Sequence, residues 1–292
     1  MAPKKRKAAL VESLAIEAPP DRVWAALTSP RDLTQLVLGK IEMSATPGAG
    51  FSWEWAVWKT MARTGGSFTW QGRVLDAVPG STLVLGPDPV VTLTVKGEGS
   101  STLLTVVQGA PPKLRGEDYE YGWADFLLKL KTLLETEPMQ NELLVRALMR
   151  ASSQQVYRAW LSPKTLAKII PGKAQLSPRP NQARVGGRFA WQHQLGKHVH
   201  RGTFLELKQN RTIAFSWESA EPRPESRRGV GTGQPPSEVR IGIHPAPFGT
   251  LVSVQHTALL RMNPGQLFAQ RTYWNRLLER FRCYFYFKGK IK

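Results

Sequence analysis

The sequence predicts an α+β fold with two similar domains in tandem, at residues 8–137 and 138–292, after a basic arm at residues 1–7. Two observations support this prediction. The same order of elements (strand, two short helices, several strands, one long amphipathic helix) can be followed twice along the 292 residues. Within each copy the strands form one run and the helices are set apart, which is typical of an antiparallel sheet with helices on one face.

Each copy begins with a strand and two helices. The segments LVESLAIEA and NELLVRALMRAS alternate as half-buried strands do. The prolines of APPDRVWAAL suit a first helical turn, and Ser152 and Ser153 are candidate N-caps in the second copy. Ser-Pro at 29–30 and at 162–163 should end this helix and begin another, because proline fits a first turn and disfavours helix in the residue before it.

The later elements also correspond. GAGFSWEW matches VGGRFAWQH, and FTWQGRVLDAVPGSTLVL matches HVHRGTFLELKQNRTIAF, which places Gly72 over Gly202. STLLTVVQ matches GTLVSVQH, an alternating strand. The last match is YGWADFLLKLKTLLE with TYWNRLLERFRCYF, which aligns Trp123 with Trp274 at the apolar spacing of a helix. Each sheet therefore has one helix that is long enough to cover it.

These segments resemble the START-like (Bet v 1-like, SRPBCC) superfamily, and within it the domains similar to the activator of Hsp90 ATPase. The motifs cover nearly all of residues 8–137, and residues 139–288 mainly through the repeat. The resemblance implies two helix-grip domains, each a curved antiparallel sheet around a long C-terminal helix with a cavity between them. It implies binding of hydrophobic ligands, co-chaperone action or, less often, catalysis in the cavity, and it brings no universal catalytic residue.

Aromatic side chains are expected to line the concave face of the first domain. Side chains on a strand alternate between faces, so Trp53 shares a face with Trp55, and Phe68 shares one with Trp70. The candidate cavity residues are Trp53, Trp55, Phe68, Trp70, Trp123 and Phe126, with Trp191 and Trp274 in the second domain.

Three histidines replace aromatics in the second copy, because the alignment places His193, His198 and His200 over Trp55, Phe68 and Trp70. Three interpretations stay open. The imidazoles could form a titratable polar pocket, could bind zinc, copper or iron, or could be solvated on an exposed hairpin. We expect no cofactor and no metal. If a metal ion were bound, its candidate ligands would be these three histidines.

Enzymatic motifs are not found: the sequence has no GxSxG elbow, no HExxH and no P-loop. The single cysteine, Cys283, excludes an internal disulfide framework and fits a small buried hydrophobe on the terminal helix. We therefore expect a binding protein and not an enzyme. The alternative is a cavity enzyme of the cyclase or hydrolase type that uses the histidines of the second domain.

The charge is unevenly distributed. The net charge is +18, and residues 138–292 hold 25 Lys and Arg against 7 Asp and Glu, whereas residues 8–137 hold 11 against 15. Such concentration indicates a polyanionic partner for the second domain, or pairing with the acidic first domain. The candidate polyanion-binding residues are Lys4, Lys5, Arg6, Lys7, Arg223, Arg227, Arg228, Arg276, Arg280, Lys288 and Lys290.

Two of these cationic segments should be disordered. Residues 219–237, SAEPRPESRRGVGTGQPPS, form an insertion with few apolar residues, which predicts a mobile loop. The arm PKKRK at 3–7 is similar to a monopartite nuclear localisation signal, and the alternative is a phosphate-contacting arm or a solubilising end.

These observations predict a non-enzymatic binding protein. Its first domain would hold an apolar small molecule, and its basic second domain would engage a polyanion, with nucleic acid as the first candidate. The alternative partner is an acidic protein surface such as that of a chaperone. The chain has no apolar run long enough for a membrane span and no secretory signal, so we expect a cytoplasmic protein that is nucleoid-associated in a bacterium or nuclear in a eukaryote.

Overall fold

The chain divides into two compact units, residues 1–137 and 138–292. The computed structural model describes residues 9–61, 69–109, 116–135, 142–170, 183–192, 199–220, 237–257, 259 and 262–288. None of the helices within these ranges is long and apolar enough to cross a membrane.

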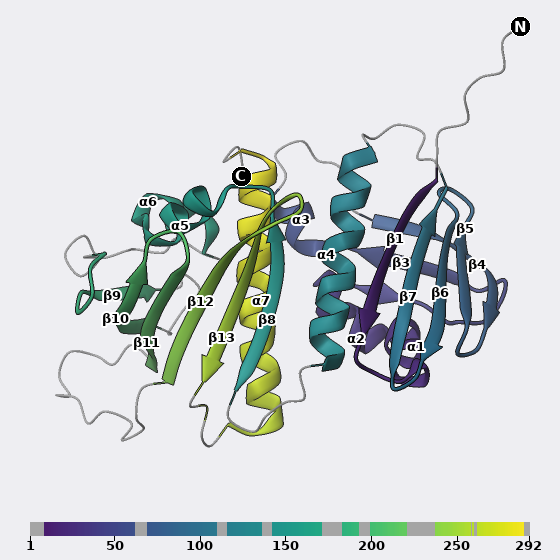
Figure 1. Cartoon of the computed structure of the whole chain (residues 1–292), viewed down its shortest axis with the longest axis horizontal. Coiled ribbons are helices and arrows are strands. Elements are labelled where there is room, and N and C mark those ends of the chain that lie inside the picture. The colour runs from purple at the N-terminus through teal and green to yellow at the C-terminus, as the bar shows by residue number, and fades with distance from the viewer. Residues whose placement is uncertain are drawn as a thin grey trace, which may run out of the picture. The chain divides into compact units, whose positions relative to one another are not determined.

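Domain 1 is an antiparallel sheet with one long helix lying alongside its first strand, β1 (Figure 1). Its strands are β1 (Leu10–Ile16), β2 (Ile41–Glu42), β3 (Gly50–Glu54), β4 (Thr69–Val78), β5 (Thr82–Gly86), β6 (Val91–Glu98) and β7 (Ser101–Gln108). They are arranged in the order β1-β7-β6-β5-β4-β3-β2. The helices are α1 (Pro20–Thr28), α2 (Pro30–Val37), α3 (Ala56–Met61) and the long α4 (Gly116–Glu135).

Domain 2 repeats this plan, with its long helix against β8 (Figure 1). Its strands are β8 (Leu143–Met149), β9 (Arg188–Gln192), β10 (Val199–Lys208), β11 (Thr212–Ala220), β12 (Ser237–Ala246) and β13 (Gly249–Thr257). Their order is β8-β13-β12-β11-β10-β9. The helices are α5 (Ser153–Leu161), α6 (Pro163–Ile169) and the long α7 (Pro264–Tyr286). The predicted α+β fold with two tandem domains is confirmed.

The predicted Ser-Pro boundaries are helix starts in both domains. Ser29 caps α2 and Ser162 caps α6, and each hydroxyl accepts a backbone N–H three residues later. Ser152, and not Ser153, caps α5, where it forms a capping box with Gln155. Each such cap stabilises its helix by about 1 kcal/mol.

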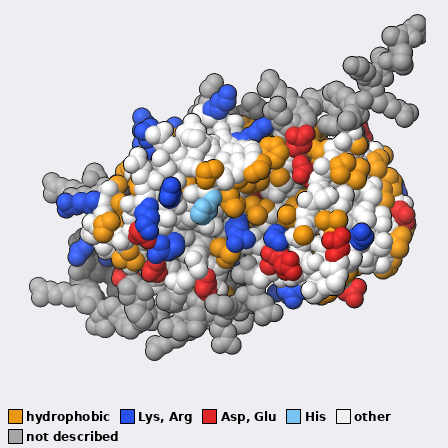
Figure 2. Space-filling model, viewed as in Figure 1, with side chains coloured by type: hydrophobic (Ala, Val, Ile, Leu, Met, Phe, Trp, Pro, Cys, Tyr) orange, Lys and Arg blue, Asp and Glu red, His pale blue; other side chains and the backbone are white. Residues whose placement is uncertain are grey.

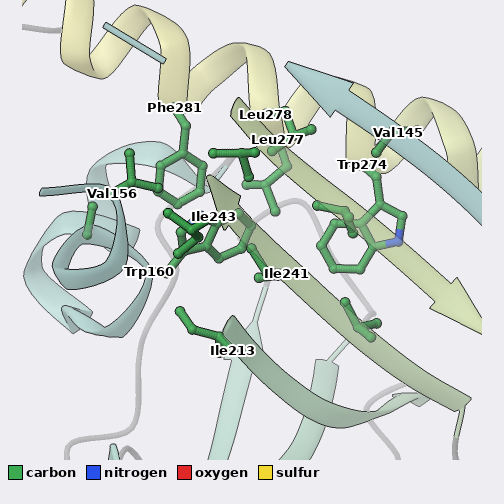
Figure 3. Packing of buried hydrophobic residues seen from close by; sticks show 14 of the residues in the cluster. Val145, Val156, Trp160, Ile213, Ile241, Ile243, Trp274, Leu277, Leu278 and Phe281 are labelled. Carbon is green, nitrogen blue, oxygen red and sulfur yellow. The ribbon is translucent and has the colours of Figure 1, made fainter. Parts of the chain in front are cut away.

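The long helix of domain 2 buries one apolar stripe against the sheet. Trp274, Leu277, Leu278 and Phe281 of α7 point toward Ile241 and Ile243 of β12 (Figure 3). The ring of Phe281 also stacks on Trp160 of α5, with 4.3 Å between centroids (Figure 3). The helix α7 thus joins the sheet to the short helices, and its removal would expose the whole core.

The repeat extends to the register of individual residues. Phe51 lies opposite Gly72 in domain 1, and Phe189 lies opposite Gly202 in domain 2. A Cβ atom on Gly72 would be 1.9 Å from the carbonyl oxygen of Gly86, and one on Gly202 would be 1.8 Å from that of Ser216. Only glycine fits either position. A β-bulge follows two residues later in both domains, at 74–76 and at 204–206.

Strands β11 and β12 include the two ends of the predicted mobile insertion, so the insertion is shorter than residues 219–237. Ser219 and Ala220 pair with His200 and Val199, and Ser237 pairs with Trp217. These three residues belong to strands because neighbouring strands satisfy their backbone groups. Residues 221–236 of the insertion lie outside the described part of the chain.

The close approach at Gly72 gives a first testable prediction. Gly72→Ala should destabilise domain 1 by at least about 2 kcal/mol, because the added methyl group overlaps a strand carbonyl that cannot move freely. Urea unfolding followed by circular dichroism measures the change.

Gly122, in α4, is the matched control, because a Cβ atom there meets no atom within 4 Å. Gly122→Ala should raise stability by about 0.5–1 kcal/mol through the better helix propensity of alanine. Equal effects of the two substitutions would contradict the steric argument.

Candidate functional site

Six aromatic side chains gather between the sheet and the long helix in domain 1. Trp53 of β3 lies opposite Trp70 of β4, and their rings meet edge to face at 5.3 Å. Phe126 of α4 stacks on Trp53 at 5.8 Å, and Trp123 meets Trp70 at 6.4 Å. The set, called here the aromatic cluster, consists of Phe51, Trp53, Trp55, Trp70, Trp123 and Phe126. It includes every predicted cavity residue of this domain except Phe68, which lies outside the described residues.

A glutamine that the sequence analysis did not single out lies beside this cluster. Gln108 ends β7 and is 1% exposed, and its Oε1 accepts a hydrogen bond of 2.7 Å from Trp123 Nε1. The alternation of the strand STLLTVVQ could have identified Gln108, because it places this residue on the buried face of the strand. A polar residue at an inward position indicates a specific hydrogen bond.

Three buried N–H donors of this region have no partner among the described residues. They are the amide nitrogen of Gln108 and the indole nitrogens of Trp53 and Trp70. Leaving such a donor unsatisfied costs about 1–3 kcal/mol, and most native structures contain only a few. The concentration of three around one cluster requires an explanation.

The corresponding interior of domain 2 contains His200. This residue lies opposite Trp191 in the strand register, as Trp70 lies opposite Trp53, so the alignment of His200 with Trp70 agrees with the register. The His200 ring is buried, stacks on Trp217 at 4.4 Å and lies 5.3 Å from Tyr273. His193 and His198 lie outside the described residues, as does the side chain of Trp191. Among the described residues no group of three or more His, Cys, Asp or Glu could hold a metal ion.

Trp217 of β11 fills the middle of this interior, and the sequence analysis missed it. Its ring centroid lies 5.1 Å from Trp274, 6.1 Å from Tyr273 and 6.3 Å from His256. The strand register makes Pro87 its counterpart in domain 1, and Pro87 is exposed beyond the end of β5. Domain 2 therefore places a large ring where domain 1 has none.

His256 lies within a continuous chain of hydrogen bonds that runs from Trp274 to the Trp217 carbonyl. It is the counterpart of Gln108, and its Nδ1 lies 3.0 Å from Trp274 Nε1, while its Nε2 lies 2.7 Å from the Ser237 hydroxyl. An indole N–H can only donate, so Nδ1 accepts, and the proton of the neutral ring is on Nε2. His256 then donates to Ser237, whose hydroxyl donates to the Trp217 carbonyl oxygen at 3.0 Å.

The position of the His256 proton on Nε2 argues against a serine nucleophile at Ser237. A serine nucleophile needs a histidine nitrogen that accepts its proton, whereas the free lone pair of His256 is already used by Trp274. Burial lowers the pKa of His256 to about 3, so the ring is neutral near pH 7. Ser237 and His256 are therefore arranged as a structural link between helix and sheet.

The described cations of the predicted polyanion set have different surroundings. Arg276 and Lys288 are exposed. Arg280 is partly buried, and its Nε donates to the carbonyl of Ile169 at the end of α6. This hydrogen bond engages the Nε atom of Arg280, and the assignment of Arg280 to the polyanion-binding set stays a prediction. The other members, Lys4, Lys5, Arg6, Lys7, Arg223, Arg227, Arg228 and Lys290, lie outside the described residues.

Acidic residues neutralise part of the surface of domain 2. Glu206 pairs with Lys208 and with Arg240, and Arg240 also pairs with Glu238. On the face drawn in Figure 2, Lys and Arg side chains form several separate groups, and some of these adjoin acids.

The burial of His256 predicts an acid sensitivity of domain 2. The folded ring titrates near pH 3 and the unfolded one near pH 6.5, so below pH 6.5 only the unfolded chain takes up this proton. The free energy of unfolding should therefore fall by about 1.4 kcal/mol per pH unit between pH 6.5 and pH 3, and not change above it. Urea unfolding at a series of pH values measures this.

His256→Gln isolates the contribution, because glutamine does the same task at position 108 and does not titrate. The difference in stability between the wild type and this variant should shrink as the pH falls below 6.5. His244→Gln, at an exposed position of β12, is the control. A difference that stays constant with pH would contradict the prediction.

Comparison with known proteins places the chain in a family. The model of the family described as "Activator of Hsp90 ATPase homolog 1-like protein" matches residues 17–135 and again residues 150–285. No curated protein sequence matches the chain.

Several solved structures are similar to the chain. Protein CV1439 from Chromobacterium violaceum is 22% identical over 50% of this chain and 98% of its own, with a TM-score of 0.40. The Aha1 dimer from Colwellia psychrerythraea is 20% identical over 51% of this chain and 98% of its own, with a TM-score of 0.39. DynU16, a putative protein of the dynemicin biosynthetic locus, is 21% identical over 94% of this chain and 98% of its own, with a TM-score of 0.38. The predicted resemblance is confirmed by the family match, which covers most of both domains, and the chain belongs to the Activator of Hsp90 ATPase homolog 1-like family, with two copies of its domain.

Proposed function

We propose that this protein is a non-enzymatic binding protein whose domain 1 holds an apolar small molecule against the aromatic cluster. The observation that carries this proposal is that three buried N–H donors, on Trp53, Trp70 and Gln108, have no partner among the described residues. Aromatic and apolar walls with a few placed polar groups are the usual composition of a small-molecule site. In domain 2, which has the same fold, Trp217 and His256 occupy the equivalent region.

Catalysis by the histidines of domain 2 has less support. His200 is stacked between aromatic rings, and His256 has both of its nitrogens in hydrogen bonds. Burial raises the pKa of Tyr273 above its ordinary range, so this phenol stays protonated. Neither His256 nor Tyr273 is therefore arranged to take a proton from a substrate.

Ligand binding by domain 1 can be tested by removing one wall of the cluster. Equilibrium dialysis of the full chain with fluorene, a planar apolar probe, should give one site per chain. Trp70→Ala should weaken binding by at least about tenfold, because both stacking area and apolar burial are removed.

Trp24→Ala is the matched control, since Trp24 packs on the core of domain 1 from α1 and is not part of the aromatic cluster. Equal losses of affinity for Trp70→Ala and Trp24→Ala would indicate general destabilisation. No binding of fluorene to the wild type would refute the site.

Charge supports a second role, for the surface of domain 2. We infer that this domain, with the arm at 1–7 and the insertion at 221–236, engages a polyanion such as nucleic acid. The supporting observation is the excess of 25 Lys and Arg over 7 Asp and Glu in residues 138–292. Binding of this kind releases counterions and weakens steeply with salt.

Charge reversal tests the second role. Arg276→Glu combined with Lys288→Glu should weaken the binding of a DNA duplex of arbitrary sequence. It should also reduce the slope of log K against log salt by about 2, because each of the two cations would otherwise neutralise one phosphate. A mobility-shift titration at several salt concentrations measures both quantities.

The control is Lys40→Glu with Lys96→Glu, at side chains of domain 1 that are 75% and 71% exposed. This pair should change binding much less. If no DNA or RNA shifts at low salt, the nucleic-acid proposal is wrong, and an acidic protein surface becomes the better candidate.

A further inference from the structure

We propose that the ligand of domain 1 carries a neutral carbonyl group on a planar apolar body, and that domain 2 does not take this ligand. The inference rests on the proposed function of domain 1 and specifies the chemical class of its ligand. It is argued from the hydrogen-bonding groups of the aromatic cluster and from their counterparts in domain 2.

The polar groups in this part of domain 1 are almost all donors. The indole of Trp123 fixes the amide of Gln108, because its N–H needs the Oε1 acceptor. The amide NH2 group of Gln108 consequently points away from that bond. The Trp123 ring also contacts that of Trp70 at 6.4 Å, and Trp70 contacts Trp53 at 5.3 Å. The indoles of Trp53 and Trp70 each carry one N–H that has no acceptor among the described residues. The only side-chain acceptor in this set is the Gln108 oxygen, which is already engaged.

A group that lacks hydrogens and offers lone pairs would satisfy these donors. A water molecule fits less well, because it would accept from the donors and then have to place its own two hydrogens where the described side chains of the cluster offer no free acceptor. A hydroxyl group meets the same difficulty with one hydrogen. A carbonyl oxygen accepts two hydrogen bonds and donates none.

The oxygen should also be neutral. A buried carboxylate needs a cation or several donors aimed at it, since leaving water costs an isolated charge far more than a dipole. The described side chains that make up the aromatic cluster and Gln108 include no Lys, Arg or His. Ketones, quinones, esters and amides on a flat apolar body therefore match the site.

Domain 2 differs from domain 1 at the positions of Gln108 and Trp70. His256 replaces Gln108 and uses both of its nitrogens, on Trp274 and Ser237. His200 replaces Trp70 and stacks on Trp217. The Trp217 ring itself lies within 6.3 Å of those of Trp274 and His256, in the middle of the interior. A ligand body would have to displace this ring, so each chain should bind one carbonyl ligand.

Matched probe pairs that differ only in the carbonyl test the inference. The full chain is titrated calorimetrically with fluorene and 9-fluorenone, and with diphenylmethane and benzophenone. Each ketone should bind about tenfold more tightly than its hydrocarbon, because it satisfies donors that the hydrocarbon leaves unpaired. The infrared carbonyl stretch of bound 9-fluorenone should move to lower wavenumber than in an apolar solvent.

Gln108→Met is the diagnostic variant, because methionine keeps the length of the side chain and has no N–H. It should lose most of the preference for the ketone while its affinity for fluorene stays within about threefold of wild type. If circular dichroism shows that Gln108→Met is unfolded, Trp70→Phe replaces it, and the same loss of preference is expected.

The outcomes are distinguishable. A ketone preference that Gln108→Met or Trp70→Phe abolishes supports the inference. Equal affinities for ketone and hydrocarbon overturn it and leave the apolar-ligand function standing. Failure of every probe to bind removes both. Two ketone sites per chain would overturn the exclusion of domain 2.

Discussion

One buried hydrogen bond joins the terminal helix to the last strand in each domain, and the two interiors are organised around it. Trp123 donates to Gln108 in domain 1, and Trp274 donates to His256 in domain 2. An indole has a single N–H, so the strand residue must offer an acceptor at that point. The second polar atom of that residue is thereby turned away from the helix. In domain 2 this second atom hydrogen-bonds to Ser237, whereas in domain 1 it has no hydrogen-bond partner among the described residues.

Much of the fold could be predicted from the sequence because it depends on local rules. Ser-Pro pairs mark helix starts through the geometry of proline and the capping serine, and period-two alternation marks strands. The glycines at 72 and 202 align because each faces a phenylalanine across a strand pair. The aromatic residues of domain 1 could be named in advance for the same reason, since alternation and helical spacing place them on one face.

The rest of the site depends on contacts between distant residues. Whether β11 continues to Trp217 is decided by pairing with β10 and β12, and the sequence carries only an indirect signal of it. Pro87 and Pro89 occupy the equivalent positions in domain 1, where proline cannot donate to a strand ladder, whereas Trp217 and Ser237 can. The surroundings of Arg280 depend on tertiary contacts in the same way. Its charge favours a surface position, but the carbonyl at the end of α6 is a partner that no local pattern reveals.

The two domains therefore differ in the hydrogen-bonding groups of their interiors and in their surface charge. Domain 2 gives both nitrogens of its interior His256 protein partners and places the Trp217 ring in the same region. Its distinguishing property is then its surface charge. Domain 1 keeps three donors without described partners, at about 1–3 kcal/mol each. A ligand that binds only the folded state returns stability in proportion to its binding free energy, so such a cost can be sustained where a ligand is normally present. Stability of domain 1 and occupancy of its interior should accordingly be coupled.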